Sequence, residues 1–112
     1  MATYLINNEI TINRQEGDTC DVTFIDVPPE INLTDATAKF QVKTSATATP
    51  IISKTTDDDI VIVSQDITVN LLPEDTKGHS GRWKWELEVT LADTSVITLG
   101  RGCFNIIAEL ID

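Results

Sequence analysis

The sequence predicts a single all-β domain, an antiparallel β-sandwich of seven to eight short strands. Short segments alternate between apolar and polar residues, turn residues separate them at near-regular spacing, and no long segment repeats with the 3.6-residue period of a helix. At 112 residues the chain is long enough to bury one core without a metal or a disulfide. We therefore expect an N-terminal arm over residues 1–8 and one sandwich domain over residues 9–112.

The clearest strand spans residues 81–91, where apolar and polar side chains alternate without a fault. The apolar positions are Trp83, Trp85, Leu87, Val89 and Leu91. A period of two over ten residues is typical of a strand with one dry face and one wet face, and a helix would scatter the two tryptophans. The pattern predicts that both tryptophans lie at the centre of the core.

The first half of the chain contains three further alternating segments. Residues 9–13 suit an edge strand, and residues 20–24 form a second strand after a Gly-Asp turn. Pro28 and Pro29 cannot donate to a strand ladder, so they predict an extended connection. Alternation returns in residues 37–43, which we expect to form the third strand.

The second half begins with expected strands at residues 51–55, 60–63 and 67–71. Residues 72–77 suit one helical turn, since a proline fits the first helical position and acidic residues favour the positive end of the helix dipole. Residues 96–99 are expected to pair back on the tryptophan strand as a hairpin.

The last strand changes the parity of its apolar residues. Ile97 and Leu99 are odd-numbered, whereas Phe104 and Ile106 are even-numbered. All four can face the core only if one extra residue is inserted, and the glycine-rich residues 100–102 predict a β-bulge there.

Charge excludes some functions and predicts one local contact. Eighteen acids against eight bases give a formal charge of −10, which disfavours binding to nucleic acid. No run of residues suits a membrane span, and the N-terminus lacks the positive region and apolar core of a secretory signal, so we expect a protein that is made in the cytoplasm. If strands 37–43 and 81–91 are neighbours, Lys39 and Lys43 should lie near Glu86 and Glu88.

Candidate chemical groups are few, and catalysis is not expected. His79 lies beside Ser80 in a polar loop, without the context of a hydrolase triad. The acids at 57–59 could offer carboxylates to calcium, but they lack the spacing of an EF-hand loop, and a solvated turn is the simpler interpretation. Cys20 and Cys103 occupy strand positions where an apolar residue is expected, and a cytosolic origin favours reduced thiols over a disulfide. We expect no cofactor and no metal.

Several short motifs together resemble a known family. They are residues 17–19 (Gly-Asp-Thr), 31–43, 72–76 (Leu-Pro-Glu-Asp-Thr), 81–87 and 102–106, in that order along the chain. The spacing of Leu71, Asp75, Gly81 and Trp83 is also similar to the corner before the sixth strand of immunoglobulin-like domains, with Trp83 where a tyrosine is usual. The chain resembles the immunoglobulin-like module that opens phage upper-baseplate proteins and recurs in small phage tail and virion accessory proteins.

The resemblance implies a virion structural protein, a baseplate, tail, neck or head accessory or adaptor subunit that acts by protein–protein contact. Its partners would be other virion proteins, in a homo-oligomer or a hetero-assembly, with no nucleic acid and no membrane. It would be located in the virion after synthesis in the host cytoplasm. The chain ends just past its last expected strand, so we expect a stand-alone module that joins or decorates an assembly.

Apolar residues on both faces of some strands, and in the N-terminal arm, are candidates for an assembly interface. They are Tyr4, Leu5, Ile6, Ile51, Ile52, Val61, Val63 and Ile107. The alternative is that the strand ends curl into the sandwich and that the N-terminal arm is frayed.

A function of another class remains open, namely a non-catalytic ligand-binding module such as an adhesion or carbohydrate-binding β-sandwich. Carbohydrate modules usually present an exposed aromatic platform. Of the six aromatic residues, all but Tyr4 are expected in the core.

Overall fold

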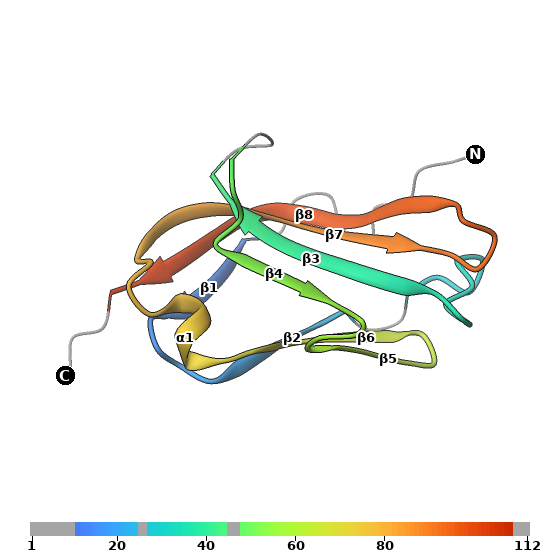
Figure 1. Ribbon diagram of the computed structural model, residues 1–112, viewed down its shortest axis with the longest axis horizontal. Coiled ribbons are helices and arrows are strands. Elements are labelled where there is room, and N and C mark those ends of the chain that lie inside the picture. Colours follow the sequence, from blue (N-terminus) through green and yellow to red (C-terminus); the bar gives the residue numbers. More distant parts are fainter. Residues whose placement is uncertain (1–10, 25–26, 45–47, 109–112) are drawn as a thin grey trace.

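The computed structural model describes residues 11–24, 27–44 and 48–108, without the side chain of Cys20, and places the strands in two layers (Figure 1). The larger sheet has the strand order β1 (Ile12–Gln15), β8 (Val96–Ile107), β7 (Gly81–Thr90), β3 (Thr37–Lys43) and β4 (Ile52–Thr55). The smaller sheet has the order β2 (Cys20–Phe24), β6 (Asp66–Leu71) and β5 (Ile60–Val63).

This distribution of strands is that of an immunoglobulin-like β-sandwich, so the predicted fold class is confirmed. Neighbouring strands are antiparallel, except that β1 runs parallel to β8. The expected helical turn is α1 (Pro73–Thr76), and within the described ranges no helix is long and apolar enough to cross a bilayer.

Aromatic residues from both sheets meet in the middle of the sandwich. The ring centroid of Trp85 lies 5.4 Å from that of Phe24 and 5.8 Å from that of Phe40, and the Phe40 ring meets Phe104 edge-on at 6.3 Å. Trp85 is 2% exposed, as predicted for a core residue. The prediction that Trp83 is equally central was wrong, because this residue is half-buried at the margin of the core.

Trp83 completes a corner where the chain passes from α1 into β7. Its indole N–H donates a hydrogen bond of 2.9 Å to the backbone carbonyl of His79, which explains why the ring lies at the margin. Upstream, a carboxylate oxygen of Asp75 accepts a 2.7 Å hydrogen bond from the backbone N–H of Leu72. A side chain of the following strand that bonds back to the backbone is the geometry of the tyrosine corner, here made by tryptophan.

The predicted bulge in the last strand is present. Leu87 lies opposite Gly100 and Glu88 lies opposite Thr98, so Leu99 is the extra residue of β8. The inserted residue keeps the apolar side chains on both sides of the bulge inside the sandwich; these are Ile97, Leu99, Phe104 and Ile106. The same change of parity turns Cys103 outward, where it is exposed and makes no disulfide, so the expectation that Cys103 takes an apolar position was wrong.

Candidate binding surface on the large sheet

The outer face of the large sheet carries polar residues in three cross-strand rows. One row contains Lys43 of β3, Lys84 of β7 and Cys103 of β8. The next contains Gln41, Glu86 and Arg101, and the third contains Lys39, Glu88 and Thr98. Because alternate residues of a strand point to the same side, all three rows face away from the small sheet.

Basic residues gather on this face. Five of the eight bases in the chain occupy outward positions on it: Lys39, Lys43, Arg82, Lys84 and Arg101. Glu86 and Glu88 are the acids among the outward positions of β3, β7 and β8, so five positive and two negative charges give a local formal charge of +3. The chain as a whole carries −10. The face therefore opposes the sign of the rest of the molecule.

The register partly corrects the predicted charge pairs. Lys39 lies directly opposite Glu88, as expected, but Lys43 lies opposite Lys84, and Gln41 takes the place opposite Glu86. Like charges directly opposite each other on neighbouring strands lower the stability of a sheet. The end of the face near Lys84 is therefore more positive than the sequence predicts.

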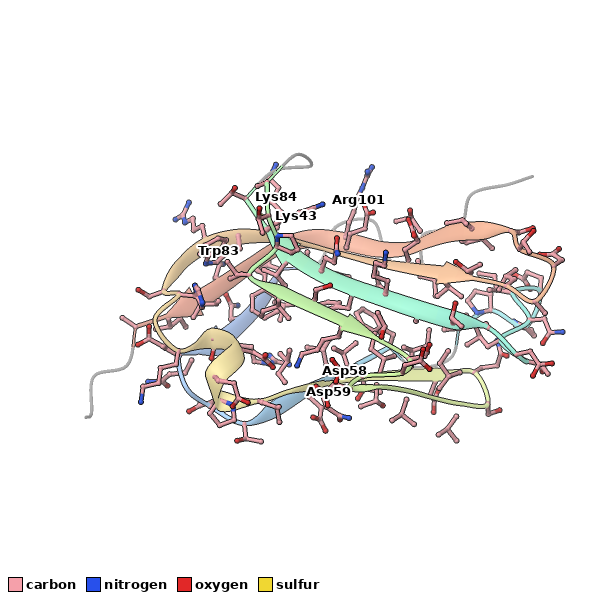
Figure 2. All side chains as sticks on the ribbon, viewed as in Figure 1. Lys43, Asp58, Asp59, Trp83, Lys84 and Arg101 are labelled. Atoms are coloured by element: carbon pink, nitrogen blue, oxygen red, sulfur yellow. The ribbon has the colours of Figure 1, made fainter. Side chains whose placement is uncertain are left out.

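A shallow depression of about 710 Å³ lies over this face. Its lining combines long cationic and anionic side chains with the short side chain of Cys103; it consists of Lys39, Gln41, Lys43, Lys84, Trp85, Glu86, Glu88, Arg101, Gly102 and Cys103. Figure 2 shows Lys43, Lys84 and Arg101 projecting from the outer side of the large sheet, whereas Asp58 and Asp59 lie by the other layer.

The cationic ends of two of these residues are available to a partner. Lys84 and Arg101 are exposed, and neither makes an ion pair with another residue of the described ranges. Their backbones belong to the two longest strands, and the neighbouring edge is held by a 3.2 Å hydrogen bond from the Gln41 amide to the Ser53 hydroxyl. Both side chains therefore project from paired strands of the sheet.

No protein-family model and no curated protein matches the chain. Among solved structures, extracellular domains 3–5 of Drosophila OTK are similar, with 14% sequence identity and a TM-score of 0.40, over 96% of this chain and 36% of that chain. Murine CRIg is similar with 9% identity and a TM-score of 0.40, over 88% of this chain and 92% of that chain. Our assignment of the fold depends on the strand order and register described above.

Lys54 forms a separate charged cluster between the layers. It is 5% exposed, and its Nζ donates to carboxylate oxygens of Asp59 and Asp75, each at 2.9 Å. Burial alone would lower the pKa of Lys54, but the hydrogen bonds and charges of Asp75 and Asp59 outweigh it and raise the pKa above its ordinary value of 10.5. This lysine therefore stays charged inside the fold and serves to join elements rather than to bind a ligand.

The candidates for an apolar interface are not brought together. Ile52 is 2% exposed and belongs to the core, and Ile51 is half-buried against it, as the alternative interpretation expected. Val61, Val63 and Ile107 are 49%, 64% and 54% exposed. The two valines lie on β5 and Ile107 on the C-terminal end of β8, and Figure 1 places these at opposite ends of the molecule. Tyr4, Leu5 and Ile6 lie outside the described residues.

The chemical candidates remain separate in the structure. The imidazole of His79 packs edge-on against Trp83, with ring centroids 6.1 Å apart, and Ser80 beside it is exposed. Among the described residues, no group of three or more histidine, cysteine or acidic side chains could hold a metal ion. In the acidic turn, Asp59 forms an ion pair with Lys54, while Asp57 and Asp58 are exposed to solvent.

The aromatic residues do not form an exposed platform on the described surface. Phe24, Phe40, Trp85 and Phe104 are buried, and Trp83 is half-buried. The charge pairs predicted from the sequence involve only Lys39 and Lys43 among these bases, and the gathering of five bases on one face was not predicted. The alternation within each strand already predicts that Lys39, Lys43 and Lys84 face away from the core. The bulge and the pairing register were needed to place these lysines and Arg101 in adjacent rows.

Proposed function

We propose that the domain is a non-catalytic binding module that docks on a partner protein through the outer face of β3, β7 and β8. The observation that carries this proposal is the concentration of five bases on one sheet face of a chain with a net charge of −10. Opposite charges on two proteins steer their association and fix their relative orientation. The five bases offer no arrangement for proton transfer or nucleophilic attack.

The setting that we propose for this module is a virion, as an accessory or adaptor subunit of a baseplate, tail, neck or head. The support is the series of short motifs that resemble those of phage immunoglobulin-like modules, including residues 72–76 before the corner and residues 81–87 after it. An adhesion module that binds a protein at a cell surface would use the same kind of face, so the two settings differ in location and not in mechanism.

Location in purified particles tests the virion setting. Particles from phage-producing cells that carry the coding sequence would be labelled with gold-conjugated antibody against the domain and examined by electron microscopy. Labelling at one structural position of the particle is the expected result. Absence of the protein from purified particles would contradict the virion setting and favour the adhesion role.

A glycan array tests the carbohydrate-binding alternative. Because the described aromatic residues are buried or half-buried, we expect no saturable binding to any glycan. Saturable binding that is lost in Tyr4→Ala would favour carbohydrate recognition over protein docking.

A further inference from the structure

Four bases form a cationic corner at one end of the binding face: Arg82 and Lys84 of β7, Lys43 of β3 and Arg101 of β8. We infer that the cationic corner binds a carboxylate-rich segment of the partner polypeptide. This inference rests on the proposed function, because it names the part of the face and the chemistry of the partner that would dock there.

Geometry brings Lys43, Lys84 and Arg101 within reach of one ligand. Lys43 and Lys84 are directly opposite across β3 and β7, and Lys84 is directly opposite Cys103 on β8. Arg101 lies two residues before Cys103, on the same side of β8, and is therefore a diagonal neighbour of Lys84. Figure 2 shows Lys43, Lys84 and Arg101 on the same outer side of the sheet. A short acidic segment lying across β3, β7 and β8 would contact all three.

The direct opposition of Lys43 and Lys84 is unfavourable in itself. Opposed lysines repel each other, and a single change to a neutral residue at position 84 would remove the repulsion. Local arrangements that lower stability without a structural benefit are expected at functional sites. A carboxylate bound at Lys84 would offset this repulsion.

The charges around the corner favour a polypeptide over a nucleic acid. Glu86 lies opposite Arg101 and Glu88 follows two residues later on the same side of β7, so acids begin in the row next to that of Lys43 and Lys84. A phosphate backbone carries charge at short, regular intervals and would meet both glutamates, in addition to the repulsion of a −10 protein. A protein segment can place acids over the cationic corner and neutral or basic residues over the glutamates.

A second copy of this chain is the less suitable partner. Two copies would each carry −10, so their long-range interaction is repulsive. A different protein with a local acidic segment avoids that repulsion. We therefore assign the cationic corner to a hetero-assembly contact.

Peptide binding tests the assignment directly. The probe is a dye-labelled hexaglutamate peptide, titrated with the domain in low salt, where charge contacts between exposed groups are screened least. Fluorescence anisotropy should show saturable binding, and ¹⁵N NMR should show shifts centred on β3, β7 and β8 near the cationic corner. Lys84→Glu/Arg101→Glu should weaken the binding at least about tenfold, which corresponds to about 1.4 kcal/mol.

Matched variants separate the cationic corner from general charge. Lys77 is exposed beside α1 and lies outside the strands of the binding face, so Lys77→Glu makes the same change of charge as Lys84→Glu at another site and should leave peptide affinity within about twofold. Lys84→Gln/Arg101→Gln should weaken binding less than the charge reversal does. Urea unfolding checks the fold, and Lys84→Glu should be at least as stable as the parent because it removes the repulsion with Lys43.

Four results in solution would overturn the inference: no saturable peptide binding, equal losses in the Lys77 and Lys84 variants, equally tight binding of a thymidine hexanucleotide through the same residues, or self-association that depends on Lys84. Incorporation into particles distinguishes failure of this inference from failure of the proposed setting. If Lys84→Glu/Arg101→Glu is still incorporated into particles, the module binds there through another surface and the assignment of the cationic corner is wrong. If the parent protein is absent from particles but binds the peptide through Lys84, the virion setting is wrong.

Discussion

At Gly100, the missing side chain makes room for the largest ring of the core. A Cβ atom at this position would lie 2.8 Å from Cη2 of Trp85, which is closer than carbon atoms pack. Trp85 is held in turn by the rings of Phe24 and Phe40, so it cannot move aside without loss of those contacts. Gly100 and Trp85 are therefore one packing unit across β7 and β8.

Gly100→Ala should lower the free energy of unfolding by about 1–3 kcal/mol, the usual cost of an added group in a filled core. Urea denaturation followed by tryptophan fluorescence measures this loss. Cys103→Ala on the same strand is the control, and because its side chain is exposed it should change stability by less than about 0.5 kcal/mol. In a Trp85→Phe background the cost of Gly100→Ala should fall, and an unchanged cost would contradict the steric explanation.

Single residues show how far the sequence alone determines position. The alternation of residues 81–91 places Trp85 in the core because every second side chain of a strand faces the same way. It cannot show that Trp83 lies at the margin, because that depends on the carbonyl of His79 in a connecting loop. Likewise, the sequence suggests that Cys103 takes an apolar position, and only the position of the bulge decides that its side chain faces solvent.

At the scale of elements, buried polar contacts join segments that the strand ladders leave separate. Lys54 of β4 reaches Asp59 before β5 and Asp75 on α1, so one ammonium group links both sheets and the helical turn. The hydroxyl of buried Thr76 accepts a 2.9 Å hydrogen bond from the backbone N–H of Gly17, which ties α1 to the turn after β1. These links fix the corner from which β7 starts.

Lys54→Met should lower the free energy of unfolding at neutral pH by about 3 kcal/mol, because it leaves two partly buried carboxylates without their cation. The pH dependence has a definite sign. The pKa of Lys54 is raised on folding above its ordinary value of 10.5, so its contribution is complete below that value and is lost as pH rises through the pKa of the folded state.

Urea unfolding between neutral pH and about pH 11.5 tests this dependence, since unfolded lysine titrates near 10.4. The alkaline loss of stability should be smaller in Lys54→Met than in the parent protein. Lys77→Met is the matched control and should show the parental loss, because Lys77 is exposed. Equal alkaline losses in all three proteins would show that the charge of Lys54 does not stabilise the fold.

Gln65 connects the turn between β5 and β6 to the proline-containing connection after β2. Its side-chain amide donates to the carbonyls of Val27, Pro28 and Ile31 at 2.9, 3.2 and 3.0 Å. Gln65→Ala should lower the free energy of unfolding by about 1–3 kcal/mol, because part-buried carbonyls lose their donor. Amide hydrogen exchange should rise at Val27 and Ile31, while the amides of β7 should keep their protection. Uniform acceleration in both places would contradict a local role.

Elements were predicted well where a periodic pattern is strong. The third strand, the tryptophan strand, the helical turn and the bulge all follow from parity and turn residues. The parallel pairing of β1 with β8 could not be predicted, because β1 is short and its partner lies more than eighty residues away along the chain. The opposition of Lys43 and Lys84 needed the exact register of β3 and β7, which the hydrophobic pattern restricts only to alternate positions.

On the scale of the whole molecule, charge is distributed unevenly. Bases gather on the outer face of the large sheet, most of the acids lie elsewhere, and the chain as a whole carries a net charge of −10. The repulsion among exposed acids lowers the stability of the compact state, and salt screens it. The buried ion pairs of Lys54 are screened much less, so salt weakens them little.

The free energy of unfolding should therefore increase when the salt concentration rises from about 10 mM to about 300 mM, since the Debye length falls well below the size of the domain. Thermal unfolding in sodium chloride measures the effect, and sulfate is avoided because it stabilises proteins by exclusion from their surface. Lys84→Glu/Arg101→Glu raises the negative charge from −10 to −14 and should show a larger gain with salt than the parent. A midpoint temperature that falls with sodium chloride would mean that attraction between exposed charges, and not repulsion, dominates in the folded domain.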